Sequence, residues 1–220
     1  MTDGPAIPVC IFAKPPVPGE VKTRLIPALG AANAAGLAGA MLLDVWRTVE
    51  SCAGIRPILA TTVIGDFPVR VSPENVWLQD GGDLGQRIER ILTRALIDSP
   101  AVIAVGADSP GLSIVHLKAA LESLQVSDAV IGPSMDGGFY LLGLKRCRSG
   151  LFSSLEWSTT QTRQAVKAKL EEEEFTITEL EPLFDIDTPG DLLLLKEQLA
   201  AHPSIAAATR AWFLQIEPAW

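Results

Sequence analysis

The chain has 220 residues, of which 48% are apolar, so it can bury a substantial core, and we expect one domain over residues 1–220 with a C-terminal helical extension at 203–220. Its formal net charge of −8 argues against a nucleic-acid-binding surface, which is normally basic. No window reaches the ~18 apolar residues of a membrane span, and the N-terminus lacks the basic and apolar regions of a signal peptide.

Cysteine and histidine usage narrows the class further. Cys10, Cys52 and Cys147 lie far apart and show no C-x-x-C spacing, so we expect reduced thiols in a cytoplasmic protein. The two histidines, His116 and His202, are too few for a histidine-rich zinc site.

Strand-like and helix-like segments alternate along the chain. Apolar runs predict strands, and amphipathic or capped segments predict helices. The expected strands cover 9–13, 56–63, 75–79, 101–107, 128–132, 138–144 and 175–180. The expected helices cover 31–52, 84–98, a helix capped by Ser113 that runs to 124, 158–172, 189–201 and 204–216. The short run 183–187 is a further extended segment.

Two local signals refine this picture. Capping boxes are expected at Asp83 with Gln86 and at Ser158 with Gln161. The run 138–144 follows its predecessor too soon for a crossover helix, so it should return as a hairpin. The sequence therefore predicts an α/β fold, a three-layer α/β/α sandwich with a mainly parallel sheet and one reversed strand.

The stretch KPPVPGEVKTRL, residues 14–25, resembles a P-loop only superficially. A P-loop needs a glycine directly before its lysine and another five positions earlier, whereas Lys22 follows a valine and Pro16 takes the earlier place. What remains is a loop with three cations, Lys14, Lys22 and Arg24. Such cations suit a di- or triphosphate, although scattered charges on a solvated loop are an equal alternative from this stretch alone.

Carboxylates follow two of the predicted elements. Asp108 comes directly after the apolar run 101–107, where it could hold Mg²⁺; the alternative is a turn in which it bonds its own backbone. Asp185 and Asp187 share one face of an extended chain, and Asp187 is the favoured second metal ligand. Asp191 should instead cap the helix that begins at 189.

Two glycine-containing stretches are ambiguous. Asp136, Gly137 and Gly138 could form a hairpin turn, or let a substrate approach the backbone while Asp136 binds its hydroxyls. Gln79 and Gly82 could face a nucleotide base.

Six motifs, in order, carry a family resemblance: IFAKPPVPGEVKTRL, QDGGDLGQRIE, GADSPGLS, GPSMDGGFYLLGL, LEWST and DIDTPGDL. Over about residues 7–200 they resemble DUF2064, a family of small bacterial GT-A-fold proteins assigned to glycosyl transfer and related to nucleotide-diphospho-sugar transferases and nucleotidyltransferases.

The resemblance implies roles for individual residues. It implies phosphate binding by Lys14, Lys22 and Arg24, a metal site of Asp108 and Asp187, and base recognition by Gln79 and Gly82. It implies a substrate region that contains Asp136, Gly137, Gly138 and Trp157, and it makes Lys14, Lys22 and Asp108 the candidate catalytic residues.

We therefore expect a transferase dependent on Mg²⁺ (or Mn²⁺) that uses a nucleotide-sugar or an NTP and a small-molecule acceptor. Two alternatives stay open: a non-catalytic nucleotide- or metabolite-binding protein with the same fold, and a structural interaction module. The sequence leaves the oligomeric state open.

Overall fold

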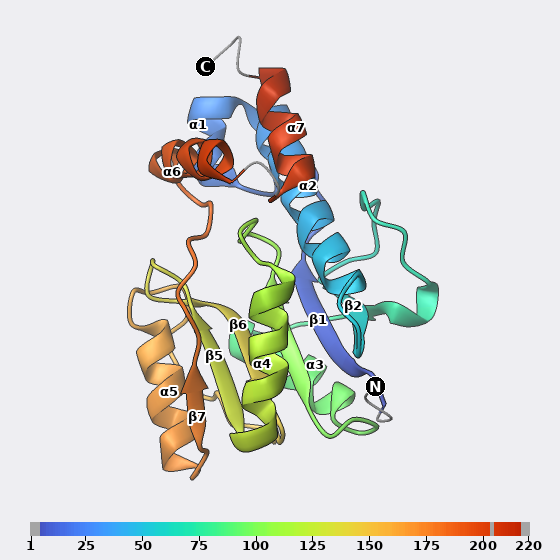
Figure 1. Ribbon diagram of the computed structural model, residues 1–220, viewed down its shortest axis with the longest axis vertical. Coiled ribbons are helices and arrows are strands. Elements are labelled where there is room, and N and C mark those ends of the chain that lie inside the picture. The colour runs from blue at the N-terminus through green and yellow to red at the C-terminus, as the bar shows by residue number, and fades with distance from the viewer. Residues whose placement is uncertain (1–4, 203–204, 217–220) are drawn as a thin grey trace.

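The computed structural model describes residues 5–202 and 205–216 (Figure 1). Its elements, in chain order, are β1 (Ile7–Ala13), a 3₁₀ turn (Thr23–Leu25), α1 (Ile26–Leu29), α2 (Ala31–Glu50), β2 (Ile55–Thr61), a 3₁₀ turn (Pro73–Asn75), β3 (Val76–Leu78), α3 (Leu84–Ala95), β4 (Val102–Gly106), α4 (Ile114–Val126), β5 (Ala129–Pro133), β6 (Phe139–Leu144), α5 (Thr162–Glu172), β7 (Ile177–Glu179), α6 (Pro189–Ala201) and α7 (Ala207–Ile216).

The strands form one sheet in the order β3-β2-β1-β4-β6-β5-β7. The pairs among β1 to β4 and the pair β5–β7 are parallel, while β6 runs antiparallel to both β4 and β5. The prediction of a mainly parallel sheet with one reversed strand is confirmed. The reversal follows from the short β5–β6 connection, which leaves no room for a crossover helix.

Helices cover both faces of the sheet, as Figure 1 shows for α4 in front of it and α3 behind it. Successive side chains of a strand point to opposite faces, so Val9 and Cys10 of β1 enter different clusters. Val9 packs in the cluster that contains α2 and α4 side chains, and Cys10 packs in the one with α3 and α5. The result is the predicted α/β/α sandwich. Cys10, Cys52 and Cys147 are free thiols.

A third cluster lies beside the sandwich. In it α6 and α7 pack against the first turns of α2, with Trp212 and Phe213 of α7 buried. Asp44 of α2 is 7% exposed and accepts hydrogen bonds from the N–H groups of Ala208 and Thr209, at 2.8 and 2.7 Å. A carboxylate at a helix N-terminus satisfies free donors and complements the helix dipole, so Asp44 fixes α7 on α2. The predicted start of this last helix at 204 lies outside the described residues.

Two local predictions were wrong. The helix expected from Ser158 begins at Thr162, and Gln161 makes no side-chain cap. The Thr162 hydroxyl instead accepts a hydrogen bond from the N–H of Thr159 at 3.1 Å, which holds residues 159–162 in a turn before the helix. The helix predicted to reach 98 ends at Ala95.

The segment 183–187 positions part of the site without being a regular strand. Leu183 forms one parallel bridge with Ser134, beside the end of β5. Further on, the N–H of Ile186 donates to the backbone oxygen of Asp108 at 3.1 Å, and the Ile186 side chain is fully buried. These backbone contacts bring the residue after Ile186 next to the loop that follows β4.

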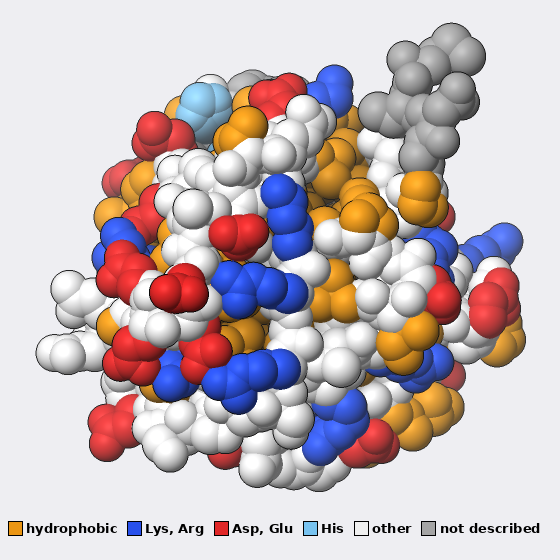
Figure 2. Space-filling model, turned by 90° about the horizontal axis from the view of Figure 1, so that it is seen from below, with side chains coloured by type: hydrophobic (Ala, Val, Ile, Leu, Met, Phe, Trp, Pro, Cys, Tyr) orange, Lys and Arg blue, Asp and Glu red, His pale blue; other side chains and the backbone are white. Residues whose placement is uncertain are grey.

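No helix among residues 5–202 and 205–216 is long and apolar enough to cross a membrane. On the face shown in Figure 2, acidic and basic side chains are interspersed, without a continuous basic patch.

Candidate functional site

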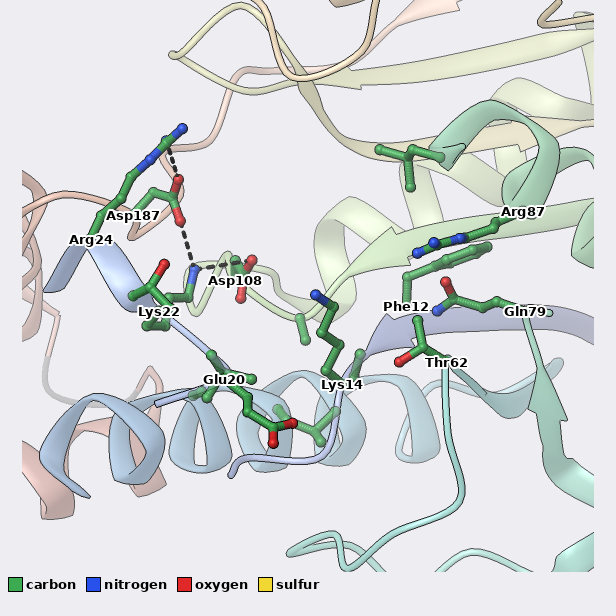
Figure 3. A pocket seen from close by; sticks show the side chains of 17 residues that line it. Phe12, Lys14, Glu20, Lys22, Arg24, Thr62, Gln79, Arg87, Asp108 and Asp187 are labelled. Carbon is green, nitrogen blue, oxygen red and sulfur yellow. Dashed lines mark hydrogen bonds and ion pairs between the residues drawn. The ribbon is translucent and has the colours of Figure 1, made fainter. Parts of the chain in front are cut away.

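A cavity of about 390 Å³ opens where β1, β3 and β4 end at their carboxyl termini. In open parallel sheets this edge is where ligands bind. The residues that line it include all three predicted phosphate-binding cations, Lys14, Lys22 and Arg24, and both predicted metal ligands, Asp108 and Asp187 (Figure 3).

Ion pairs join four of these side chains at one end of the cavity. Lys22 Nζ lies 3.0 Å from Asp108 Oδ2 and 3.3 Å from Asp187 Oδ1, and Arg24 Nη1 lies 2.7 Å from Asp187 Oδ2. The Lys22 side chain is 5% exposed, whereas those of Asp108 and Asp187 are about half exposed. The two carboxylates, 79 positions apart in sequence, therefore face one cation. Both carboxylates were assigned to one metal site from the sequence, but their contact with Lys22 was not predicted.

The backbone of Lys22 is unusual for a lysine. It has φ 48° and ψ 42°, in the left-handed region, directly before the 3₁₀ turn. Non-glycine residues adopt this conformation uncommonly, and it persists where the surroundings fix it. In this protein the turn points the Lys22 side chain at the two carboxylates.

Lys14 lies between the ion pairs and the other end of the cavity (Figure 3). It is an exposed residue that directly follows β1. Among the described residues no carboxylate forms an ion pair with it, so its ammonium is available to a ligand.

The far end of the cavity contains Phe12, Thr62, Gln79 and Arg87 (Figure 3). Gln79 is 4% exposed, and its side-chain amide donates to the backbone oxygen of Ala60 at 2.8 Å. Gln79 thus ties the end of β3 to β2, and its side-chain oxygen is the atom left for a ligand.

Arg87 lines the cavity but was not predicted as a site residue from the sequence. Gly82 was predicted to face a base, and it is not among the residues that line the cavity. Arg87 Nε is buried without a hydrogen-bond partner among the described residues. The signal available for Arg87 was its place one turn after the Asp83 cap, whose capping box with Gln86 is confirmed. Gly82 has φ +108°, and an added Cβ would meet the Gln86 side chain, so its conformation serves the turn before α3.

A second cavity, of about 300 Å³, adjoins the first, and Phe12, Leu84 and Asp108 line both. Its other lining residues come from β4 and the loop after it, from α3 and β6, from the β5–β6 turn, from the start of α5 and the loop before it, and from the segment before α6. They include Asp136, Gly138, Trp157 and Asp185.

The β5–β6 turn has the features of a hairpin turn. Asp136 Oδ1 accepts hydrogen bonds from the Ser134 hydroxyl at 2.6 Å and the Gly138 N–H at 2.8 Å. Gly137 has φ +93°, and an added Cβ would lie 2.0 Å from the Thr160 backbone oxygen. Gly137 therefore lets the turn pack on the loop before α5, and it is not among the residues that line the cavity, unlike Asp136 and Gly138.

Asp185 and Asp187 are separated by the structure. Asp187 lines the first cavity with the ion pairs, and Asp185 lines the second. Burial raises the pKa of Asp185 to about 6, and the negative charges of Asp136 and Asp187 act in the same direction. Lys22 opposes this rise.

The metal prediction rests on two carboxylates. Within residues 5–202 and 205–216 no group of three or more His, Cys, Asp or Glu side chains is arranged to hold a metal ion. A Mg²⁺ bound here would take its remaining ligands from water and substrate, which is how Mg²⁺ is usually held at phosphate sites.

Residues 60–159 match the family described as "Uncharacterized protein conserved in bacteria (DUF2064)". The predicted resemblance to DUF2064 is confirmed. The matched segment runs from the end of β2 to the loop before α5, and so contains Gln79, Asp108, Asp136 and Trp157. None of the curated proteins matches the chain.

Solved structures extend the comparison over the DUF2064 segment and beyond it. A crystal structure described as a "putative nucleotide-diphospho-sugar transferase" from Desulfovibrio desulfuricans G20 is 26% identical, with a TM-score of 0.86 over 98% of this chain and 96% of that one. A cytidylyltransferase from Leptospira borgpetersenii serovar Hardjo-bovis is 14% identical, with a TM-score of 0.57 over 98% and 95%.

A CMP:2-keto-3-deoxy-manno-octonic acid synthetase, solved in complex with CTP, is 12% identical, with a TM-score of 0.55 over 90% of this chain and 99% of that one. The chain has the nucleotide-diphospho-sugar transferase-like fold. Proteins of this fold include transferases of nucleotide-linked groups.

Proposed function

We propose that this protein is a Mg²⁺- (or Mn²⁺-) dependent transferase that binds a nucleotide-sugar or an NTP in the first cavity and transfers a group to a small-molecule acceptor. The observation that carries the proposal is the position of Lys22 Nζ, 3.0 Å from Asp108 and 3.3 Å from Asp187, beside Arg24 and Lys14 at the carboxyl edge of the sheet.

The donor set fits a hard divalent cation. Asp108 and Asp187 supply carboxylate oxygens, both lie within 3.3 Å of one ammonium, and both are about half exposed. Mg²⁺ favours such oxygen ligands and keeps several waters or phosphate oxygens. Asp108 and Asp187 would hold the ion, which when bound would neutralise charge on the phosphates of the ligand.

The cations of the loop would hold the phosphates. Arg24 and Lys14 are exposed and can donate charge-assisted hydrogen bonds to phosphate oxygens. Lys22 is the candidate to leave the two carboxylates and contact phosphate as the ligand enters. At the opposite end, the Gln79 side-chain oxygen and Arg87, which line the cavity, would face the nucleoside.

Catalysis would then consist of positioning and charge stabilisation, without a covalent protein intermediate. In glycosyl transfer, an acceptor hydroxyl attacks the anomeric carbon and its proton is released to solvent, while the bond from that carbon to the phosphate oxygen breaks and a nucleoside diphosphate leaves. In nucleotidyl transfer, an acceptor phosphate oxygen attacks the α-phosphorus and pyrophosphate leaves. Lys14 and Lys22 would stabilise the charge on the leaving phosphates in either reaction.

Calorimetry and product analysis test the proposal. The protein is titrated with ADP, GDP, CDP, UDP, dTDP and the matching triphosphates, each with Mg²⁺ and with EDTA. We expect at least one nucleotide to bind and to lose affinity in EDTA. The binding nucleotide, as NTP or as nucleotide-sugar, is then incubated with an acceptor panel, and released pyrophosphate is compared with released diphosphate.

Three results have distinct meanings in this experiment. Turnover with either leaving group supports the transferase. Tight, Mg²⁺-dependent binding without product for any acceptor would favour the non-catalytic nucleotide-binding protein. Absence of binding by every nucleotide would overturn the proposed function.

A further inference from the structure

The two adjoining cavities differ in whether cations line them, since the first has cations beside the carboxylates of Glu20, Asp108 and Asp187, and the second has carboxylates alone. Lys14, Lys22, Arg24 and Arg87 line the first. None of the described residues that line the second is a lysine or an arginine, and three carboxylates, those of Asp108, Asp136 and Asp185, line it. A negatively charged ligand group would find cations in the first cavity and none in the second.

The carboxylates of the second cavity are placed to accept hydrogen bonds. Asp136 Oδ1 is engaged by Ser134 and Gly138, which fixes its side chain and leaves Oδ2 as an acceptor. Asp185 is half-buried and lines the same cavity as Asp136. Fixed carboxylate oxygens suit the hydroxyl donors of a ligand, because hydrogen bonds to charged acceptors are stronger than neutral ones.

Aromatic side chains form much of the remaining wall. Phe139, Tyr140 and Trp157 line the cavity, and the Phe139 and Trp157 rings meet edge to face with centroids 6.3 Å apart. The hydroxyl-bearing Ser158 and Thr159 lie in the same wall. An apolar wall with a few fixed polar groups is typical of a small-molecule site and accommodates the C–H faces of a ring between its hydroxyls.

Asp108 connects the two cavities, because it lines both and forms the ion pair with Lys22. A ligand with its phosphates beside Lys22 could therefore continue past Asp108 into the second cavity. That arrangement suits a molecule with an anionic nucleotide half and a neutral second half.

We propose that the second cavity binds an uncharged, polyhydroxylated group, such as a neutral sugar ring, and rejects groups that carry a phosphate or carboxylate. The inference rests on the proposed function, because it says what chemical group lies in the second cavity when a nucleotide occupies the first. It favours glycosyl transfer over the nucleotidyl reaction described above, in which the acceptor brings a phosphate to this position.

Matched nucleotide esters test this assignment. The nucleoside diphosphate that binds is compared by calorimetry with its glucose ester and its glucuronic acid ester, which differ only by a carboxylate in place of a CH₂OH group. We expect the glucuronic acid ester to bind roughly tenfold or more weakly than the glucose ester, because like charges brought together in an enclosed site repel strongly. A second titration tests the acceptor. Free glucose and glucose 1-phosphate are each titrated into protein that is saturated with the nucleoside diphosphate, and their affinities are compared.

The two arms identify the source of the neutral group. A glucose ester that binds more tightly than the diphosphate alone identifies the sugar of the donor. Binding of free glucose, but not glucose 1-phosphate, to the saturated protein identifies the acceptor. Either result supports the inference.

Asp136→Asn and Asp185→Asn keep the side-chain shape and remove one charge each, so each should reduce the discrimination against the glucuronic acid ester. Asp98→Asn is the matched control, because Asp98 lies in the exposed loop before β4, at the opposite edge of the sheet, and should leave the discrimination unchanged.

Equal affinity for the two esters, or tighter binding of the glucuronic acid ester, would overturn the inference. The proposed function would still stand in that case, because a nucleotide binds. A glucosamine ester that binds more tightly than the glucose ester would also overturn it, by assigning the cavity to a cationic group. Failure of every nucleotide to bind would instead remove the proposed function and the inference with it.

Discussion

The ammonium of Lys22 lies 3.0 Å from the carboxylate of Asp108, and the Lys22 side chain is only 5% exposed. The same ammonium lies 3.3 Å from Asp187. Lys22 therefore separates two acids that would otherwise repel each other, at the position where we propose that a divalent cation binds.

This geometry predicts opposite effects of Lys22→Met on stability and on metal binding. Without Lys22 the two carboxylates lack their shared cation, so the free energy of unfolding should fall by about 1–3 kcal/mol, between the values for exposed and buried pairs. Mn²⁺ alone should bind more tightly, because it no longer competes with an ammonium. Thermal melts and Mn²⁺ titrations followed by electron paramagnetic resonance measure both effects. Lys118→Met, at an exposed position on α4, is the control; unchanged Mn²⁺ affinity in Lys22→Met would contradict the competition.

Asp108→Asn should abolish Mg²⁺-dependent nucleotide binding without unfolding the protein. The amide is nearly the same size but lacks the charge that a hard cation requires. The hydrogen bond from Ile186 uses the backbone oxygen of Asp108, so the substitution leaves it intact. Calorimetry with the binding nucleotide checks the loss. Glu20→Gln, which removes another carboxylate from the lining of the first cavity, should retain binding; full affinity in Asp108→Asn would exclude Asp108 as a metal ligand.

Lys14→Met should weaken every nucleotide by a similar factor, whatever the base. Lys14 has no carboxylate partner among the described residues, and a hydrogen bond to a charged group contributes about 1.5–3 kcal/mol, roughly 10- to 150-fold in affinity. Competition between nucleotides with different bases measures the factor for each. A loss confined to one base would place Lys14 at the nucleoside end of the ligand.

Asp191→Ala should lower stability and also disturb Asp187. Asp191 Oδ2 accepts from the N–H of Asp187 at 2.9 Å and from the N–H and hydroxyl of Thr188 at 2.6 and 2.9 Å. Loss of such a helix cap costs about 0.5–2 kcal/mol. Because Asp191 holds the Asp187 backbone by this hydrogen bond, Asp191→Ala should also displace Asp187. We therefore expect Asp191→Ala to weaken metal binding and Asp187→Ala to abolish it.

Thermal melts with and without Mg²⁺ and nucleotide separate the two roles. Asp191→Ala should lower the melting temperature of the free protein and keep a reduced ligand-induced shift. If Asp187→Ala lowers the melting temperature of the free protein and retains the full shift, Asp187 has a structural role and the two-carboxylate metal site is wrong.

The substitution Glu179→Gln should make the free energy of unfolding less dependent on pH in the acidic range. The hydrogen bond from Lys167 to Glu179, at 2.6 Å, lowers the Glu179 pKa, and Arg163, at 2.9 Å, acts in the same direction. A lowered carboxylate pKa stabilises the fold above the unfolded value of 4.5, and this contribution disappears as the pH falls from 4.5 through the folded pKa. We expect the variant to be about 0.5–1 kcal/mol less stable at pH 7 and equal to wild type at low pH.

Denaturant unfolding of both proteins between pH 7 and pH 3 measures this difference. Glu122→Gln, at an exposed position on α4, should keep the wild-type pH profile. A difference between Glu179→Gln and wild type that persists unchanged at pH 3 would show that packing, rather than charge, links β7 to α5.

The sequence alone determined most of the helices and strands and the presence of one reversed strand in a mainly parallel sheet, because these follow from short-range physics. The apolar run of β4, the Asp83 capping box and the short link from β5 to β6 act over a few residues. The start of α5 was mispredicted at Ser158, because a Thr159–Thr162 turn replaces the expected cap and the helix begins at Thr162. Only the tertiary structure decided which charges meet. Lys22, Asp108 and Asp187 are far apart in the chain and come together through the parallel sheet, the left-handed turn at Lys22 and the hydrogen bond from Ile186. The same long-range packing placed Asp185 and Asp187, two residues apart, in separate cavities of different charge.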